Sequence, residues 1–212
     1  AVVAQARALG VRAHALALDV GESATFAAFA EEVTQLLARE WQRTHFNFLV
    51  NNAGIGIHAS FEQTTEEQFD TLLNIHFKGT FFLTQQLLPL IRDGGRIINI
   101  ASMAALRVLP QIGIYCMSKA AMVQMTKALA CAWAAQNIQV NAILPGWIDT
   151  DLTRQARVDV QGLHDRVLER TPAKRWGVPN DFAGIAVFLA SSASDFITGA
   201  AIPVDGGYSV QG

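Results

Sequence analysis

Short apolar runs alternate with longer helical patterns along this chain of 212 residues, and that alternation restricts the possible folds more than any other feature. Each run is rich in leucine or β-branched residues and is bounded by Gly, Pro, Asn or Asp, as strands are. Runs that are apolar on both faces are typical of a parallel sheet covered by helices on either side. The predicted strands are residues 14–19, 47–52, 96–101, 138–144 and 200–204.

The segments between these runs carry apolar residues at helical spacing. The predicted helices are residues 23–40, 65–91, 115–135 and 180–190. Residues 1–9 look like the last turns of a further helix, with Gly10 as its stop signal. Strands and helices in alternation predict an α/β fold, with a doubly wound parallel sheet in three α/β/α layers. At this length we expect one domain, residues 1–212.

Composition excludes several classes of protein. Apolar residues make up 51% of the chain and charged residues 16%, which excludes intrinsic disorder and indicates extensive buried surface. The formal net charge is −2, so no electrostatic argument supports a nucleic acid or a membrane surface as partner. The longest apolar run, residues 182–190, is far shorter than the ~20 residues that a membrane helix needs.

Cysteine and histidine usage adds two expectations. Cys116 and Cys131 form no CxxC pair, which favours reduced thiols in a cytoplasmic protein over a disulfide framework. The five histidines are scattered along the chain without zinc spacing, so we expect no metal site.

One motif is misleading. Residues 54–59 match the G-x-G-x-x-G/A pattern and follow a predicted strand. A dinucleotide-binding turn requires a helix to begin inside the motif, so that the helix N-terminus faces the pyrophosphate. Here residues 60–64 precede the helical spacing, and no acidic residue ends a second strand where a ribose ligand should be. We therefore predict a strand end with a Gly-rich loop beside a ligand.

Tyr115 and Lys119 carry the strongest chemical signal. They are four residues apart and so share one face of the predicted helix over residues 115–135. A nearby ammonium favours tyrosinate and would lower the pKa of Tyr115 from about 10, so that this side chain could exchange a proton near neutral pH. Without further support, the same spacing would indicate an ordinary surface pair.

Other polar residues gather at the carboxyl ends of the predicted strands, where ligands bind in open α/β sheets. Ser102 directly follows residues 96–101 and lies thirteen residues before Tyr115. Asn74 is an amide inside a predicted helix, where a short polar side chain is slightly unfavourable. The other strand-end residues are Asp19, Val20, Asn52, Ala53, Gly54, Pro145, Gly146, Trp147, Ile148 and Thr150.

Together these motifs resemble the short-chain dehydrogenase/reductase family. NNAG at residues 51–54, Ser102, the YxxxK pair and PGxxxT at residues 145–150 occur in the order and spacing of that family. The resemblance covers all 212 residues, from the segment before Asp19 to the tail at residues 205–207. It implies a Rossmann-like domain with a seven-stranded parallel sheet. It also implies hydride transfer between a nicotinamide cofactor and an alcohol or carbonyl.

The resemblance implies a catalytic set of four residues. Tyr115 would be the general acid/base on the substrate oxygen, and Lys119 would lower the pKa of Tyr115 and hydrogen-bond the nicotinamide ribose. Ser102 would hold and polarise the carbonyl. Asn74 would position a water in the proton relay.

The resemblance also implies contacts with cofactor and substrate. The adenosine half of the cofactor would meet Asp19, Val20, Asn52, Ala53 and Gly54. The nicotinamide end would be lined by Pro145, Gly146, Ile148 and Thr150, together with Tyr115 and Lys119. The expected substrate contacts are Ser102, Gln111, Tyr115 and Trp147.

The opening segment of the family has no counterpart at the start of this sequence. A TGxxxGxG turn with its first strand, helix and second strand takes about 30 residues or more. Because the residue that selects the cofactor follows that second strand, we expect NAD or NADP without further distinction. We expect the sequence to be a fragment of a longer natural chain.

The predicted helices over residues 65–91 and 115–135 are more apolar than one buried face requires, which indicates contact with another subunit in a dimer or tetramer. The expected function is an NAD(P)-dependent oxidoreductase acting on a small secondary alcohol, sugar or polyol, or the corresponding ketone. One alternative is 3-oxoacyl-[acyl-carrier-protein] reductase, which a basic patch beside the pocket would favour. Another alternative is a non-catalytic scaffold protein.

Overall fold

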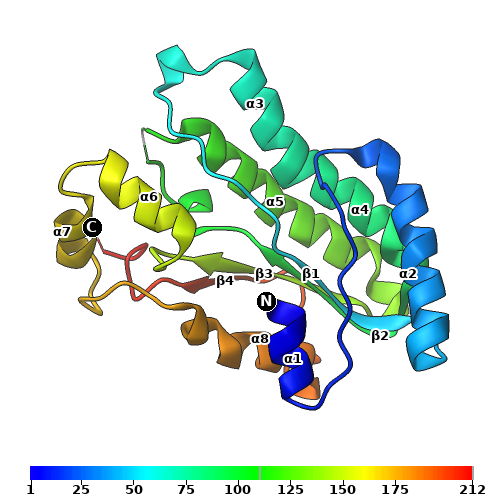
Figure 1. Cartoon of the computed structure of the whole chain (residues 1–212). Coiled ribbons are helices and arrows are strands. Elements are labelled where there is room, and N and C mark those ends of the chain that lie inside the picture. Colours follow the sequence, from blue (N-terminus) through cyan, green and yellow to red (C-terminus); the bar gives the residue numbers. More distant parts are fainter. Residues whose placement is uncertain (110, 212) are drawn as a thin grey trace.

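The computed structural model describes residues 1–109 and 111–211 (Figure 1). The strands of this described part form one parallel sheet in the order β1-β2-β3-β4. They are β1 (Phe46–Asn51), β2 (Ile91–Ile100), β3 (Gln139–Pro145) and β4 (Ala201–Val204). Four of the predicted strands are thus confirmed, although β2 begins earlier in the chain than predicted.

Helices cover both faces of the sheet. The helices drawn above it in Figure 1 are α2 (Phe26–Trp41), α3 (Glu66–Leu73), α4 (Thr80–Leu87) and α5 (Gly113–Ala132). Below it lie α1 (Val2–Ala8) and α8 (Ala183–Ala190). Val140 and Leu144 of β3 pack with Met122 of α5, whereas Ile143 packs with Leu189 of α8. Because successive side chains of a strand point to opposite faces, this packing confirms the predicted three-layer α/β/α fold.

The predicted strand over residues 14–19 is wrong. The connection between α1 and α2 carries no strand and runs as coil, dark blue in Figure 1, up to a 3-10 turn at Ser23–Thr25. Leu18 and Val20 pack instead against the core between α2 and β1. The carbonyl of Val20 lies so close to Gly79 that a side chain at that position would collide with it. A strand needs a neighbouring backbone to pair with, and an apolar run does not supply that partner.

The predicted helix over residues 65–91 is not one regular helix. Thr65 caps α3, with a capping box to Gln68. Residues Asn74–Gly79 then form a π-helical turn between α3 and α4. Pro89 lies in a short 3-10 turn after α4, and Ile91 already begins β2. Proline lacks the N–H that continues a helix, which explains why the helix ends before Ile91.

Buried polar side chains connect the sheet to the helices above it. The Asn51 amide donates to Thr84 Oγ1 at 3.0 Å and to Asn99 Oδ1 at 2.8 Å. The Asn99 amide donates in turn to Thr126 Oγ1 at 2.9 Å. These bonds join the carboxyl ends of β1 and β2 to α4 and α5, so they fix the end of the sheet where polar residues were predicted to gather.

The segment between β3 and α8 forms α6 (Asp151–Asp159) and α7 (Leu163–Arg170), at the left end of Figure 1. Cys116 is buried and Cys131 is exposed, and both are free thiols. Within the part of the chain that the structure describes, no helix is both long and apolar enough to cross a bilayer.

Candidate active site

Two cavities meet at the carboxyl ends of β2 and β3. The larger has a volume of about 520 Å³ and the smaller about 100 Å³. Five residues line both of them: Ser102, Tyr115, Gly146, Leu152 and Thr153. The hydroxyl-bearing side chains of Ser102 and Tyr115 therefore lie at the junction, where groups held in the two cavities would face each other.

The ends of two elements place these side chains. Ser102 follows β2 and is buried, and its Oγ accepts a hydrogen bond from the Ala104 N–H at 3.1 Å. Tyr115 lies in the first turn of α5, which begins at the same edge of the sheet, and Lys119 follows one turn later. The predicted one-face spacing of Tyr115 and Lys119 thus brings both side chains to the larger cavity.

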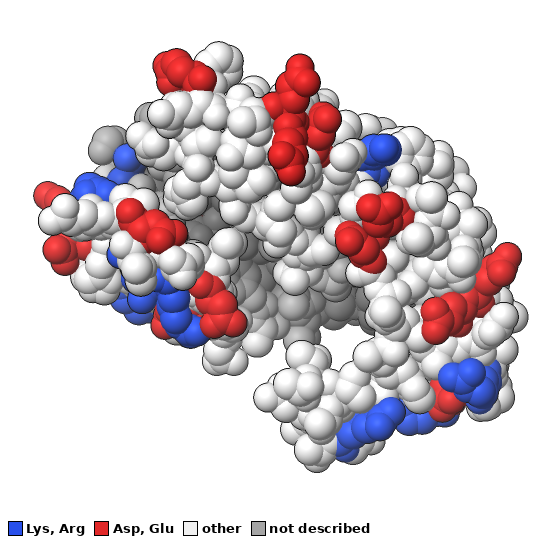
Figure 2. All heavy atoms as spheres, turned by 45° about the horizontal axis from the view of Figure 1, so that its top comes forward, with Lys and Arg blue, Asp and Glu red and all other residues white. Residues whose placement is uncertain are grey.

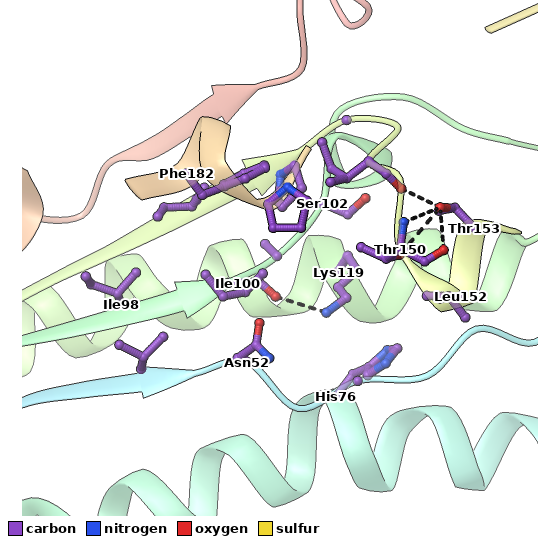
Figure 3. A pocket seen from close by; sticks show the side chains of 18 of the residues that line it. Asn52, His76, Ile98, Ile100, Ser102, Lys119, Thr150, Leu152, Thr153 and Phe182 are labelled. Atoms are coloured by element: carbon purple, nitrogen blue, oxygen red, sulfur yellow. Dashed lines mark hydrogen bonds between the residues drawn. The ribbon is translucent and has the colours of Figure 1, made fainter. Parts of the chain in front are cut away.

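Lys119 is a buried cation. Its side chain is 4% exposed, and Nζ donates to the Ile100 carbonyl at 3.0 Å, the dashed line beside Lys119 in Figure 3. Burial lowers the pKa of Lys119 from 10.5 to about 8. The ammonium form therefore still predominates at pH 7, but less completely than for a lysine in water.

The expected lowering of the Tyr115 pKa is wrong for this arrangement. Burial raises the pKa of Tyr115 above 10, and a hydrogen bond from Ser102 opposes that shift only in part. The Lys119 ammonium lies over the Tyr115 ring, 5.7 Å from the ring centroid. Desolvation of the phenolate therefore outweighs the attraction that the sequence spacing suggested, and the hydroxyl stays protonated at neutral pH.

His76 lines the larger cavity, whereas Asn74 lines neither cavity. Asn74 is half-buried at the start of the π-helical turn, and His76 is fully buried two residues later. Figure 3 shows His76 projecting from that helix towards the space beside Lys119. A sequence signal for His76 exists: it lies four residues from each of the buried residues Leu72 and Thr80.

Six of the predicted cofactor-binding residues line the larger cavity together with Tyr115 and Lys119. They are Asn52, Gly54, Pro145, Gly146, Ile148 and Thr150. Val20 and Ala53 line an adjoining groove of about 450 Å³ beside β1, which shares Val50 and Asn52 with the larger cavity. Asp19 is exposed, and its carboxylate accepts the Gly21 N–H at 2.8 Å within a turn.

Of the predicted substrate contacts, likewise, some line a cavity and one does not. Trp147 lines the smaller cavity with Ser102 and Tyr115. Gln111 is exposed and lines neither cavity, and its carbonyl instead accepts a hydrogen bond from the Ala59 N–H at 3.0 Å. The smaller cavity has a largely apolar wall that includes Met103, Leu109, Ile112 and Leu152, and His58 also lines it.

The arginines of α6 pair with carboxylates in that helix and just before it, outside the cavities. Arg154 and Arg157 both contact Asp149 Oδ1, at 3.2 Å and 3.0 Å, and Arg154 also contacts Asp151 at 2.6 Å. Figure 2 shows basic and acidic side chains intermixed at this end of the molecule. The described residues thus present no continuous basic patch on this visible face beside the pocket.

A family model described as enoyl-(acyl carrier protein) reductase matches residues 1–209. The chain belongs to the short-chain dehydrogenase/reductase family. The predicted oxidoreductase family is thereby confirmed, together with the Rossmann-like fold. The match extends over nearly the whole chain.

The chain is similar in sequence to several dehydrogenases of this family. 2-Dehydro-3-deoxy-D-gluconate 5-dehydrogenase from Dickeya dadantii is 40% identical over 204 residues, which cover 95% of this chain and 78% of that protein. The enzyme of the same name from Escherichia coli is 41% identical over 167 residues, covering 77% of this chain but 66% of the relative, slightly less than two thirds. A solved gluconate 5-dehydrogenase from Burkholderia cenocepacia, in complex with NADP and tartrate, is 33% identical with a TM-score of 0.89, covering 100% of this chain and 81% of that one.

Proposed function

We propose that this protein is an NAD(P)-dependent oxidoreductase that interconverts a secondary alcohol and its ketone. One observation carries the proposal: Ser102 and Tyr115 lie at the junction of a large cavity and a small one, with Lys119 in the wall of the large one. Two reactants held in adjoining cavities would meet at two hydroxyl groups that can hydrogen-bond and protonate an oxygen.

The larger cavity suits a nicotinamide cofactor. Gly54 forms part of its wall, and a Cβ at that position would lie 3.2 Å from His76 Nε2 and 3.6 Å from Lys119 Nζ. The backbone thus leaves open a space that any other residue would fill. Solved members of the family contain NADP or NAD, which supports either form. We propose that Asn52, Gly54, Pro145, Gly146, Ile148, Thr150 and Lys119 hold the cofactor.

The nicotinamide ring would take up or supply the hydride, and the side chains of this chain would manage the proton. In ketone reduction the Tyr115 hydroxyl donates its proton to the substrate oxygen. In alcohol oxidation the deprotonated Tyr115 takes the proton back. The Ser102 hydroxyl hydrogen-bonds the same oxygen, and the positive charge of Lys119 stabilises the phenolate after proton transfer.

We propose a small uncharged alcohol, sugar or polyol, or the corresponding ketone, as substrate. The names of relatives point to hydroxylated carbon chains, including sugar acids. Among the described residues that line the smaller cavity, however, there is no lysine or arginine. Burying a carboxylate without a cationic partner is costly, so this lining favours the uncharged members of that class.

The two alternative functions have less support. A reductase for acyl-carrier protein would need a basic surface, and the arginines of α6 are already paired with Asp149 and Asp151. A scaffold protein would have no need for a buried lysine beside a buried serine and a tyrosine, because burying that charge costs stability.

We further propose a dimer or tetramer in the cytoplasm. Phe69, Phe77 and Phe82 are exposed on the helices over residues 65–91, and Met117 is exposed on α5. Exposed apolar side chains on two neighbouring helices favour burial against a second subunit. Light scattering coupled to gel filtration would measure the subunit number, and a monomer at micromolar concentration would contradict this proposal.

A cofactor titration followed by turnover tests the enzymatic proposal. The protein is titrated with NADPH and separately with NADH, and binding is followed by nicotinamide fluorescence. Turnover is then measured with neutral polyols, ketoses and sugar acids through the absorbance of the reduced nicotinamide. We expect one cofactor to bind more tightly and at least one neutral substrate to react. If neither cofactor binds and no substrate reacts, the proposal is wrong and the scaffold function takes precedence.

A further inference from the structure

His76 is a buried imidazole in the wall of the larger cavity, and the proposed chemistry does not use it. Its side chain is 0% exposed. It stands in the π-helical turn Asn74–Gly79, and such turns occur frequently at functional sites. Its ring lies edge-on to that of Tyr115, with the two centroids 5.4 Å apart and the planes at 84°. A fully buried histidine beside the acid/base tyrosine requires a role of its own.

Both ring nitrogens of His76 are engaged. The Ile55 N–H donates to Nε2 at 3.0 Å, and Nδ1 lies 2.8 Å from Ser118 Oγ. The Ser118 hydroxyl in turn donates to the Tyr115 carbonyl at 2.8 Å. Because a backbone N–H can only donate, Nε2 must be the acceptor, and the single proton of a neutral imidazole must then be on Nδ1. The hydrogen-bond chain therefore runs from Ile55 through His76 and Ser118 to Tyr115.

The surroundings of His76 oppose its protonation. Burial, followed by the positive charge of Lys119, lowers the pKa of His76 from 6.5 to about 3. From α5, the Tyr115 ring contacts the imidazole and the positive charge of Lys119 acts on it. With both nitrogens engaged and the cationic form excluded at neutral pH, His76 has no free proton to exchange with a substrate.

We propose that His76 is a positioning residue: a neutral imidazole with its proton on Nδ1 that joins the loop at Gly54-Ile55 to the turn of α5 between Tyr115 and Lys119. The loop lies on the proposed cofactor side of the site, and the α5 turn carries the proton-transfer side chains. The connection fixes the position of the loop relative to the turn of α5. The proposal rests on the proposed function for its kinetic consequence, but the tautomer and the connection do not depend on turnover.

Two substitutions at His76 each remove one of its two hydrogen bonds and leave the other. In His76→Gln, the longer amide can place its oxygen near the position of Nε2 and retain the bond from Ile55, while the bond to Ser118 is lost. In His76→Asn, the shorter amide can still donate towards Ser118 but cannot reach Ile55. Ser118→Ala removes the same bond as His76→Gln without changing the imidazole. His45→Gln, in an exposed loop where Thr44 is the hydrogen-bond partner, is the matched control.

We expect some of these variants to change mainly kcat and another to change mainly the KM for the cofactor. His76→Gln and Ser118→Ala should each lower kcat by about tenfold with little change in the KM for the cofactor, because a buried partner near Tyr115 is lost. His76→Asn should raise the KM for the cofactor by about tenfold with a smaller change in kcat. His45→Gln should match the wild type. Equal effects of Gln and Asn on both parameters would overturn the proposal.

Two further measurements distinguish positioning from acid/base catalysis and from a failure of the proposed function. Imidazole nitrogen NMR should show His76 neutral with its proton on Nδ1 from pH 5 to pH 9, whether or not the protein turns over any substrate. A titration near pH 6.5, or a proton on Nε2, would overturn the proposal. The pH profile of kcat should keep its shape in His76→Gln, and loss of one limb of that profile would instead identify His76 as an acid/base.

Discussion

His76 Nδ1 and Ser118 Oγ lie 2.8 Å apart in the protein interior although 42 residues separate them in the chain. One residue belongs to the π-helical turn between α3 and α4, and the other to α5. The contact between these two side chains joins the two elements at the candidate active site, and substitution can test it directly.

His76 should make the protein sensitive to acid. The pKa of His76 is about 3 in the folded protein against 6.5 ordinarily. Between these two values the unfolded chain binds more protons than the folded one, so the free energy of unfolding should fall as the pH drops from 6.5 towards 3. His76→Gln has no such group and should lose this part of the pH dependence. Urea unfolding of both proteins at pH 7 and pH 4.5 measures how their free energy of unfolding changes with pH. An equal change in the two proteins would contradict the prediction.

Burial of Lys119 should lower the free energy of unfolding. Its pKa is lowered to about 8 by burial, so the unfolded chain binds more protons between pH 8 and 10.5 and the free energy of unfolding should rise with pH through that window. Below pH 8 the full penalty is present. Lys119→Met should therefore be more stable at pH 7 by about 1–2 kcal/mol, and turnover should be lost. Thermal unfolding of the variant at pH 7 would refute this if its midpoint fell below that of the wild type.

Tyr115→Phe should lower turnover strongly without loss of cofactor binding. Removing a general acid/base lowers kcat by about 10²- to 10⁴-fold. The chain contains a second tyrosine, Tyr208, which is buried but lines neither cavity of the site. Tyr208→Phe makes the same chemical change there and should retain turnover. Steady-state rates and a nicotinamide fluorescence titration of both variants check this prediction, and comparable losses in the two would count against it.

Gly146 should not tolerate a side chain. A Cβ at this position would lie 2.6 Å from the Asp205 Cβ and 2.7 Å from its Cα, so the backbone after β3 or β4 would have to move. We expect Gly146→Ala to lose about 2–3 kcal/mol of stability. At Gly113, in the first turn of α5, a Cβ meets nothing within 4 Å. Gly113→Ala should be neutral or more stable by about 0.5 kcal/mol, so urea midpoints should shift in one variant and not the other.

Much of the fold could be predicted because its signals are local. Apolar runs bounded by turn residues predicted β1, β2, β3 and β4, and the YxxxK spacing alone placed Tyr115 and Lys119 on one face of α5. Ser102 was predicted from its place after a strand. Each of these inferences depends on a few consecutive residues and on the geometry of a regular helix or strand.

The errors arose where distant parts of the chain decide the structure. Residues 14–19 have the composition of a strand but no neighbouring strand to pair with. Asn74 was chosen for its amide, whereas the ring that reaches the cavity is that of His76, in a turn that is not α-helical. The pKa of Tyr115 depends on burial by residues of several elements, which its spacing from Lys119 does not reveal.

The π-helical turn also restricts which changes evolution can accept in this region. It accommodates one residue more than an α-helical turn would. A deletion between residues 74 and 79 would let the helix close regularly with α3 and α4 keeping their faces, so the change would fall on the side chains of the turn itself. The bond from the Asn51 amide to Thr84 would then survive, whereas His76 would turn away from Ser118. The exposed position of Lys78 can therefore vary among descendants of this gene, whereas the number of residues in the turn cannot.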